Sequence, residues 1–376
     1  MAFQKVLELS ELPAGTSKVV KLGNKKVALF NYNGKITALG NACLHRGGPL
    51  GLGCVEKKND GYYVTCPWHG WEYNIESGAA PPGYHDQQSV FEVKVEGNDI
   101  LLNDKELVAA KKANHDSPLL EDLVKLKYQT TPDSLNILGI SATNMNNGLP
   151  RYSTSEAALE DVLEYAKEKH NAATKTLKLR NLNFRHCEGY YSQHAQACNW
   201  PCSITEAEPA DGMTQIYTDM VLWADIVLLA TPIRWGQASS LYYKMCERLN
   251  TVQNQITIKD KILIKNKVAS FIITGGQDNI QQVSGQMMSF FTSLGFVIPP
   301  FSFVGWSRGW TAEDMDKNVL QFKKNEYVKR SSREMLDNTV ELLMNIKKMD
   351  YKKITAPLPH KKDSFTGDME NPDMNL

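Results

Sequence analysis

The sequence lacks an excess of charge of either sign. Lys and Arg together number 42, and Asp and Glu also number 42, so the formal net charge is zero. Binding a nucleic acid requires a basic surface that neutralises phosphates, and this composition does not indicate one. We therefore expect small molecules or other proteins as partners, and no nucleic acid.

Long apolar runs are also missing. The N-terminus, MAFQKVLELSELPAG, has no basic segment followed by an apolar stretch, which a signal peptide would have. The most apolar stretch, Val221 to Pro232, is too short to cross a bilayer and contains Asp225. These absences predict a protein without membrane contact, and the expected location is the cytoplasm.

Cysteine is sparse and glycine motifs for dinucleotides are absent. The seven cysteines are an odd number and do not suggest a disulfide framework, so most of them should stay reduced. No G-x-G-x-x-G motif occurs, so a Rossmann dinucleotide site is not indicated.

The length of 376 residues is sufficient for two domains, each with its own core. Residues 1–105 contain short β-type runs separated by turns such as Gly23-Asn24 and Asn33-Gly34, which predicts an all-β domain. The runs are Lys18–Leu22, Lys26–Tyr32, Lys35–Leu39, Val90–Val95 and Asp99–Leu102.

The remainder of the chain has a different pattern. Residues 106–133 are charged and predict a linker, with a short helix at Leu119–Lys127. Residues 134–350 alternate strands with helices, which predicts an α/β domain with a doubly wound parallel sheet covered on both faces. Residues 351–376 are polar and contain three prolines, which predicts a disordered tail. The expected strands are 134–141, 176–182, 226–230, 268–274 and one after Gly295, and the expected helices are 156–169, 213–223, 241–249, 283–294 and 312–348.

Two short segments of the β domain carry metal-ligand residues. Cys43-Leu-His45 and Cys66-Pro-Trp-His69 each supply one thiolate and one imidazole, and each has a glycine within two residues after its histidine. Two thiolates on one iron and two imidazoles on the other form a Rieske [2Fe–2S] arrangement. The glycines allow two loops to fold over such a cluster. A tetrahedral zinc site, or a chance pairing, remains an alternative.

The first 105 residues resemble the Rieske ferredoxins, from ELPAGTSKVV through NACLHRGGPL and CPWHGWEYN to FEVKVEGNDILLN. The resemblance is to the soluble ferredoxin and oxygenase type, because Gly48 or nearby residues and Trp68 stand where the respiratory type has its extra cysteines. This implies the absence of the respiratory disulfide and the lower end of the potential range. Cys54 lies between the two boxes, and we expect a buried thiol there and not a fifth ligand.

Three loops of the second domain are candidates for a ligand site. Residues 141–155 are rich in Ser, Thr and Asn and lead into a helix, which suits a phosphate but also an ordinary helix cap. Thr231–Gly236 and Thr274–Asp278 each follow a buried strand. Open α/β sheets bind ligands at the carboxyl ends of their strands, so the three loops together predict one site.

Residues 134–350 resemble the flavodoxin-like NAD(P)H-dependent FMN reductases and related quinone reductases, through these loops and the helix ending CERLN. The resemblance implies that the first loop holds the FMN phosphate and the other two border the isoalloxazine. The first loop is longer than in the family and has Thr143-Asn144 where a basic stretch is common, and Trp235 could instead be a packing residue. The predicted FMN-contacting residues are Ser141, Thr143, Asn144, Ser153, Thr154, Ser155, Thr231, Pro232, Ile233, Arg234, Trp235, Gly236, Thr274, Gly275, Gly276 and Gln277.

Other cysteines lie in the second domain. Related flavoproteins can carry a second cluster near Cys187, Cys198 and Cys202, but these are too few and too loosely spaced, so structural thiols are favoured over a cluster or redox pair. Cys246 lies on a predicted helix face and should be part of the core.

The combination of centres favours an NAD(P)H-dependent oxidoreductase that moves electrons between a nicotinamide donor, FMN and a Rieske cluster. The alternatives are a quinone or other small-substrate reductase fed by the cluster, and a non-enzymatic carrier or redox sensor that docks to an oxygenase or reductase. The sequence identifies no catalytic residue, acceptor, direction of electron flow or preference for NADH over NADPH. A homo-oligomer is expected by analogy with flavodoxin-like reductases.

Overall fold

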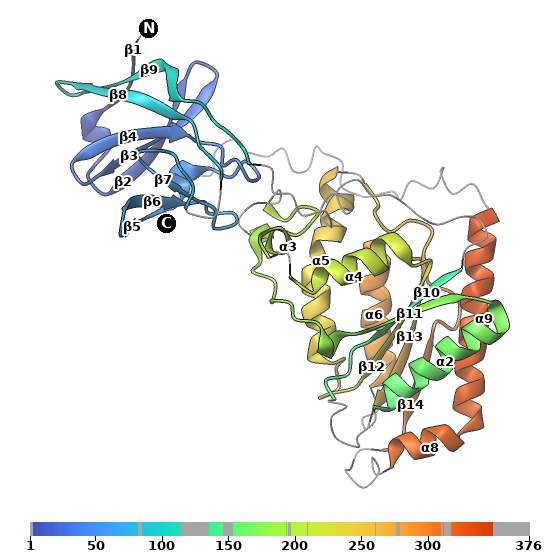
Figure 1. Cartoon of the computed structure of the whole chain (residues 1–376). Coiled ribbons are helices and arrows are strands. Elements are labelled where there is room, and N and C mark those ends of the chain that lie inside the picture. Colours follow the sequence, from blue (N-terminus) through green and yellow to red (C-terminus); the bar gives the residue numbers. More distant parts are fainter. Residues whose placement is uncertain are drawn as a thin grey trace. The chain divides into compact units, whose positions relative to one another are not determined.

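The computed structural model describes residues 3–81, 85–113, 135–145, 153–192, 194, 197–208, 210–259, 261–275, 279–309, 311 and 317–348. The chain divides into two compact units (Figure 1). Unit 1 comprises Met1–Asp116 and Glu188–Cys198, and unit 2 comprises Ser117–Cys187 and Asn199–Leu376. The chain therefore enters unit 1 twice, which the sequence pattern did not indicate.

Unit 1 consists of two antiparallel sheets. The larger has six strands in the order β1-β9-β8-β4-β3-β2, and the smaller has three in the order β5-β6-β7. Asn33 and Gly34, which join β3 to β4, have φ values of 54° and 71°, as a tight hairpin turn requires. The strands are β1 (Phe3–Glu8), β2 (Thr16–Leu22), β3 (Lys25–Tyr32), β4 (Lys35–Gly40), β5 (Cys54–Lys58), β6 (Gly61–Thr65), β7 (Glu72–Asn74), β8 (Val90–Glu96) and β9 (Asp99–Val108).

The predicted β domain is confirmed, and its core follows from strand alternation. In β3, Val27 and Leu29 belong to one buried cluster, whereas Ala28 and Phe30 belong to another. The second cluster also contains Cys43, Cys66 and two tryptophans. The cysteines of the two predicted metal-binding segments are therefore part of the hydrophobic core of unit 1.

Unit 2 contains a parallel sheet of five strands in the order β11-β10-β12-β13-β14. This order, 2-1-3-4-5, is that of the flavodoxin-like doubly wound fold, and the predicted α/β class is confirmed. The strands are β10 (Asn136–Ser141), β11 (Ala173–Lys178), β12 (Ile226–Pro232), β13 (Val268–Gly275) and β14 (Phe303–Ser307).

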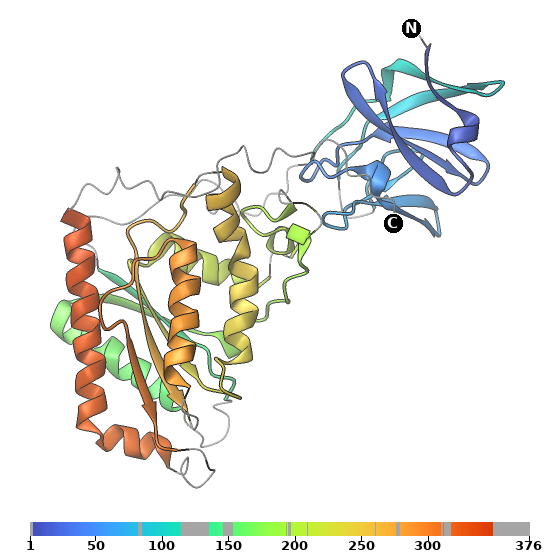
Figure 2. The same cartoon turned by 180° about the vertical axis from the view of Figure 1, so that it is seen from behind.

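Helices cover both faces of this sheet, as Figures 1 and 2 show from opposite sides. Leu228 and Ala230 of β12 pack with one group of helices, and Val227 and Leu229 pack with the other. One group is α2 (Thr154–His170), α8 (Asn318–Lys324) and α9 (Glu326–Lys348), and the other is α4 (Met213–Ile216), its π-helical continuation Tyr217–Trp223, α5 (Ser240–Lys259) and α6 (Ile280–Leu294).

Some predicted elements were wrong in extent. The strand expected at 176–182 begins at Ala173 and gives way to a 3-10 turn at Leu179. The single long helix expected at 312–348 is two helices, because the Asn325 side chain accepts a hydrogen bond from the backbone N–H of Val328 (3.2 Å) and caps α9. The helix predicted at 119–127 and the tail at 351–376 lie outside the described residues.

Among the described residues, no helix is both long and apolar enough to span a bilayer.

Candidate metal centre and ligand-binding edge

The two ligand boxes of unit 1 form loops of the same design. In the loop after β4, the Cys43 N–H donates to the Gly48 carbonyl (2.8 Å) and the Gly47 N–H donates to the Cys43 carbonyl (2.7 Å). In the loop between β6 and β7, the Cys66 N–H donates to Trp71 (2.7 Å) and the Gly70 N–H donates to Cys66 (3.0 Å). Gly47 and Gly70 have φ values of 85° and 72°, which favour glycine at the equivalent position of both loops.

Each loop directs backbone N–H groups at its own cysteine sulfur. His45 and Arg46 donate toward Cys43, and Trp68 and His69 donate toward Cys66. The two sulfurs also lie within hydrogen-bonding distance of each other. The bond with Cys66 lowers the pKa of the Cys43 thiol to about 7, while the same bond raises the pKa of Cys66. The loops thus favour a thiolate in a buried place.

The two histidines form a second pair. The Nδ1 atoms of His45 and His69 are 3.1 Å apart, and the residues are 5% and 8% exposed. The His45 ring stacks on the Trp71 indole, with centroids 4.0 Å apart and planes inclined by 8°. Packing therefore fixes the direction in which the His45 nitrogens point.

These pairs fit a cluster with two metal positions. A metal–nitrogen bond is about 2.0–2.1 Å long, so two Nδ1 atoms 3.1 Å apart can reach one ion. Within the described residues, no three His, Cys, Asp or Glu side chains group around a point that could hold a single metal ion. This favours the arrangement with thiols on one metal and imidazoles on another over a tetrahedral zinc site.

Asp86 holds Trp71, the ring on which His45 stacks, and it was not among the residues predicted from the sequence. Its carboxylate is 3% exposed and accepts hydrogen bonds from the Trp71 indole N–H (3.1 Å) and the Ala113 N–H (2.7 Å). No motif surrounds Asp86 in the sequence, so its role follows only from tertiary packing.

Replacing Asp86 with alanine is expected to destabilise unit 1 by about 1–3 kcal/mol, because the buried indole N–H of Trp71 would lose its partner. The denaturant concentration at which cluster absorbance disappears measures this loss. Glu76→Ala is the control, because Glu76 forms an exposed ion pair with Lys35, and its effect should stay below about 1 kcal/mol. Equal midpoints for the two variants would contradict this role of Asp86.

A third segment completes the site. Glu188–Cys198, hereafter the capping segment, belongs to unit 1 although it follows β9 by some eighty residues in the chain. Ala197 is fully buried in the cluster that contains Cys43 and Cys66, and its carbonyl lies 2.5 Å from Nε2 of His69. No signal in the sequence indicated that this segment would cover the ligands.

The remaining cysteines differ in their surroundings. Cys54 is exposed on β5, so the expected buried thiol is wrong, because β5 is an outer strand of the small sheet. Cys246 is buried in the core of unit 2, as expected. Cys187, Cys198 and Cys202 are half-buried.

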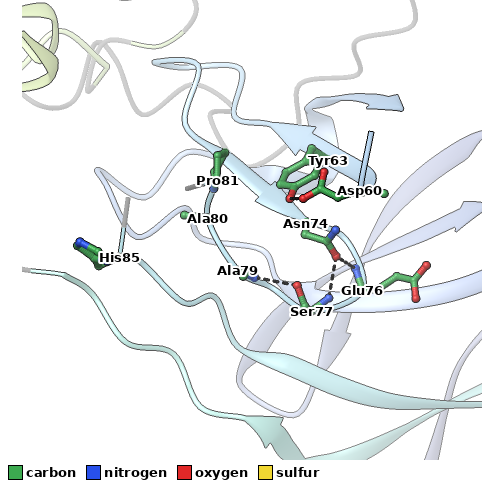
Figure 3. A pocket seen from close by; sticks show the side chains of 10 residues that line it. Asp60, Tyr63, Asn74, Glu76, Ser77, Ala79, Ala80, Pro81 and His85 are labelled. Atoms are coloured by element: carbon green, nitrogen blue, oxygen red, sulfur yellow. Dashed lines mark hydrogen bonds between the residues drawn. The ribbon is translucent and has the colours of Figure 1, made fainter. Parts of the chain in front are cut away.

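A cavity of about 670 Å³ lies at the opposite end of the β6–β7 hairpin from the cysteine and histidine loop (Figure 3). The groups that line it bond within the same turns. The Asn74 side chain accepts hydrogen bonds from the N–H groups of Glu76 (3.0 Å) and Ser77 (2.9 Å), and the Tyr63 hydroxyl donates to Asp60 (2.8 Å). None of the predicted site residues lines this cavity.

In unit 2 the three predicted loops follow β10, β12 and β13, which are neighbours in the sheet. Hydrogen bonds join the loops to one another. The Ile233 N–H donates to the Thr274 carbonyl (2.8 Å), the Asn279 side chain donates to the Gly236 carbonyl (2.9 Å), and Asn144 donates to Ser240 (3.0 Å). The structure therefore brings the three loops together at one edge, while Gly276 and Gln277 lie outside the described residues.

The residues predicted to hold a phosphate are buried at this edge. Ser153, Thr154 and Ser155 form the start of α2, and the hydroxyls of Ser153 and Ser155 lie 3.0 Å apart. The N–H groups of a helix N-terminus favour an anion. Thr143 is also buried, and its hydroxyl accepts the Met145 N–H (3.2 Å).

The Ser141 hydroxyl, which was predicted to contact FMN, forms a hydrogen bond with a protein side chain. It donates to the carboxylate of Glu156 (2.7 Å), which also accepts hydrogen bonds from Arg180 (2.9 Å) and Lys178 (2.8 Å). Burial alone raises the pKa of Glu156, but these hydrogen bonds outweigh it and hold the pKa at about 2. An ionised carboxylate with two cations thus sits in the first turn of α2, and sequence reasoning did not anticipate it.

Trp235 lies in a tight turn in which Arg234 and Gln237 exchange both backbone hydrogen bonds (2.7 and 2.9 Å). Trp235 and Gly236 have φ values of 50° and 72°. The indole is 94% exposed, so the alternative that Trp235 packs in the core is wrong.

The β domain with the paired cysteine and histidine loops and the domain with the flavodoxin-like sheet each match a known family. The Rieske [2Fe-2S] domain model matches residues 2–93, and the NADPH-dependent FMN reductase model matches residues 135–311. The chain belongs to the Rieske [2Fe–2S] family through its N-terminal region and carries an NADPH-dependent FMN reductase domain behind it. The first domain implies a [2Fe–2S] cluster, and the second implies a flavin.

Relatives match parts of the chain. The biphenyl dioxygenase ferredoxin subunit of Pseudomonas sp. (strain KKS102) is 30% identical over 105 residues, which are 27% of this chain and 93% of that protein. Apoptosis-inducing factor 3 of Mus musculus is 36% identical over 99 residues, which are 26% of this chain and 16% of the relative. The chain also spans only 14% of the human protein of that name. A structure of RosB with a bound 8-demethyl-8-formylriboflavin-5'-phosphate intermediate covers 65% of this chain and 90% of its own, with 18% identity and a TM-score of 0.47.

Proposed function

We propose that the chain is an NAD(P)H-dependent oxidoreductase in which electrons pass between a nicotinamide donor, FMN in unit 2 and a Rieske cluster in unit 1. Cys43 and Cys66 would hold one iron, and His45 and His69 the other. The loops after β10, β12 and β13 would hold FMN, with Ser153–Ser155 at its phosphate. When bound, FMN exchanges two electrons with a hydride donor, whereas the cluster exchanges one at a time.

The observation that carries this proposal is the presence of both prepared sites in one chain. The Nδ1 atoms of His45 and His69 are 3.1 Å apart and buried, beside two thiols that accept backbone N–H groups. Three loops meet at the carboxyl edge of a flavodoxin-ordered sheet. A two-electron site and a one-electron site are the components of a converter between hydride donors and single-electron acceptors.

The chain's own residues prepare the flavin edge. Gly275 ends β13 against Ile233, where a Cβ would lie 2.7 Å from the Ile233 Cβ. This close approach lets the loop after β12 lie on the end of β13. Because Gly275 has no side chain, the loop after β12 can pack directly against the end of β13.

Gly275→Val is expected to weaken flavin binding at least about tenfold while the cluster content stays unchanged, because the loop holding Ile233 would be displaced. The dissociation constant for FMN, measured by fluorescence quenching, tests this. Gly285→Ala is the control, since a Cβ at that helical glycine has no heavy atom within 4 Å. Flavin affinity that is equal in both variants would argue against a site at this edge.

Stepwise anaerobic addition of NADH or NADPH tests the proposed function. Flavin absorbance should bleach first, and the EPR signal of a reduced Rieske cluster should then appear. A Cys66→Ser variant should show flavin bleaching without the EPR signal. If the flavin bleaches in the unaltered protein while the cluster stays oxidised, the proposed electron flow is wrong.

A second candidate has some support from a relative. The 8-demethyl-8-aminoriboflavin-5'-phosphate synthase of Streptomyces davaonensis is 29% identical over 83 residues, which are 22% of this chain and 32% of that enzyme. In this candidate, unit 2 transforms a small molecule with electrons from the cluster. Mass spectrometry of the flavin after turnover distinguishes the two, because an electron-transfer cofactor should be recovered unchanged.

A further inference from the structure

The short segment that follows β9 folds back onto the metal-binding part of unit 1. The Lys111 backbone exchanges both hydrogen bonds with the Gln87 backbone (2.8 and 2.7 Å). Two residues later, the Ala113 N–H donates to the Asp86 carboxylate (2.7 Å). The backbone on either side of Lys112 is therefore attached to unit 1, and this attachment determines where the Lys112 side chain begins.

The Lys112 side chain reaches one of the proposed cluster ligands. Its Nζ donates a hydrogen bond to the backbone carbonyl of His45 (3.2 Å). The His45 ring stacks on Trp71, and the Trp71 indole N–H donates to Asp86. The carboxylate that holds the Lys112 segment thus also holds the ring on which His45 stacks. One connected set of contacts positions the ammonium beside this ligand.

The positive charge of Lys112 is not neutralised by an ion pair. Among the residues that the structure describes, no Asp or Glu pairs with Lys112, and its hydrogen bond goes to a neutral carbonyl. One-electron reduction of a cluster at this site adds one negative charge there. A cation close to that charge stabilises it. The position of Lys112 therefore favours the reduced state of the cluster.

Lys111 provides a matched comparison in the same segment. It carries the same charge one position away, and its bridge to Gln87 makes the backbone extended there. Successive side chains of an extended backbone point to opposite sides. The Lys111 side chain forms neither a hydrogen bond nor an ion pair with any described residue. The two lysines thus differ in their contact with His45 and not in their charge.

We propose that Lys112 stabilises the reduced Rieske cluster and thereby favours passage of electrons from the flavin to the cluster. This inference rests on the proposed function. Lys112 is a positioning residue, because it acts through its charge and through the His45 backbone. In each reduction the cluster gains one electron and its donor loses one; the donor is the flavin in the proposed function and dithionite in the test. During turnover a one-electron acceptor reoxidises the cluster.

The test uses three variants of the full-length holoprotein. Lys112→Met removes the charge but keeps an unbranched side chain of similar length, and Lys112→Arg keeps the charge. Lys111→Met is the control, because it removes an equal charge that has no contact with His45. Iron and sulfide contents, measured first, establish that each variant holds its cluster.

The first readout is the reduction potential of the cluster, which does not depend on activity. The EPR signal of the reduced cluster is followed during dithionite titration with mediator dyes at low ionic strength. The equilibrium constant for reduction should fall about threefold or more in Lys112→Met. It should change less than about twofold in Lys112→Arg and Lys111→Met. All variants keep Asp86 and Arg46, the charged groups nearest in the chain to Trp71 and His45, so the difference reports Lys112. Equal potentials for Lys112→Met and Lys111→Met would overturn the inference.

The second readout separates charge from structural damage. Lys112 is exposed, so dissolved ions reach its charge, and the screening length falls from about 30 Å at 0.01 M salt to about 3 Å at 1 M. The difference in potential between the unaltered protein and Lys112→Met should therefore shrink as salt is added. A difference that stays constant would show that Lys112→Met distorts the ligand loop, and it would overturn the role of the charge.

Failure of the inference and failure of the proposed function give different results. If the unaltered protein shows the EPR signal of a reduced Rieske cluster and all variants share its potential, only the role of Lys112 is wrong. If dithionite produces no such signal in the unaltered protein, the proposed function is wrong and this inference is wrong with it.

Discussion

Gly48→Ala is expected to abolish cluster binding while unit 1 keeps its β structure. A Cβ at this position would lie 2.6 Å from the Cys66 sulfur and 3.0 Å from Cγ of the Trp68 indole. Neither neighbour can move far, because both are buried in the core cluster of unit 1. The displaced sulfur would no longer pair with Cys43, so iron and sulfide content should fall to near zero while the far-ultraviolet circular dichroism is retained.

Gly47→Ala is the matched comparison for Gly48→Ala. A Cβ at Gly47 meets no heavy atom within 4 Å, so the cost is only that of placing a side chain at a φ of 85°. That cost is about 1–2 kcal/mol. The Gly47→Ala variant should therefore still bind the cluster, while the free energy of unfolding of unit 1 is reduced. Similar iron content in the two variants would show that the contact between Gly48 and Cys66 does not limit assembly.

Glu156→Ala is expected to destabilise unit 2 by about 3 kcal/mol or more. The carboxylate is buried and holds the Arg180 guanidinium, whose side chain is only 9% exposed, together with the Ser141 hydroxyl. Removing one partner of a buried ion pair leaves an uncompensated charge and typically costs about 3–5 kcal/mol. Denaturant unfolding followed by flavin release or circular dichroism measures the change.

Glu160→Ala is the control for Glu156→Ala. Glu160 also pairs with Lys178, but its side chain is 56% exposed, so its loss should cost less than about 1 kcal/mol. Equal effects of the two substitutions would contradict the role assigned to burial.

The acid stability of unit 2 should depend on the same carboxylate. The pKa of Glu156 is about 2 in the fold, against 4.5 for an unperturbed glutamate, because of the bonds to Arg180, Lys178 and Ser141. A lowered pKa contributes stability that is fully present above pH 4.5 and is lost as the pH falls toward 2. Replacing Glu156 with Gln should remove this part of the pH dependence, and unfolding curves recorded between pH 2 and 6 test it. If the Glu156→Gln variant kept the same pH dependence of unfolding as the unaltered protein, Glu156 would not be the source of the acid sensitivity.

The sequence was sufficient for the fold class. Strand alternation and turn residues such as Asn33-Gly34 predict the β domain, because these signals are local. The loops after β10, β12 and β13 could be assigned to one edge of the sheet because each follows a buried strand. Element ends were less accurate, since the split between α8 and α9 depends on one cap at Asn325.

The contacts that finish each site could not be predicted. The Ala197 carbonyl meets His69 across 128 positions of sequence, and Asp86 meets Trp71 with no motif around it. At the flavin edge, Ser141 was expected to face a phosphate, yet its hydroxyl donates to Glu156. Such pairings depend on how separate elements pack, and nothing in the residue types of one segment specifies the partner in another.

The position of the capping segment has a consequence for biosynthesis. The strands that carry Cys43 to His69 leave the ribosome before residues 188–198, because the chain is made from its N-terminus. During that interval the histidine pair lacks its cover from Tyr190 and Ala197. The delay offers a period in which an iron–sulfur donor can reach the ligands, after which the arrival of the segment closes the site. A fragment ending before Glu188 would keep that site permanently open.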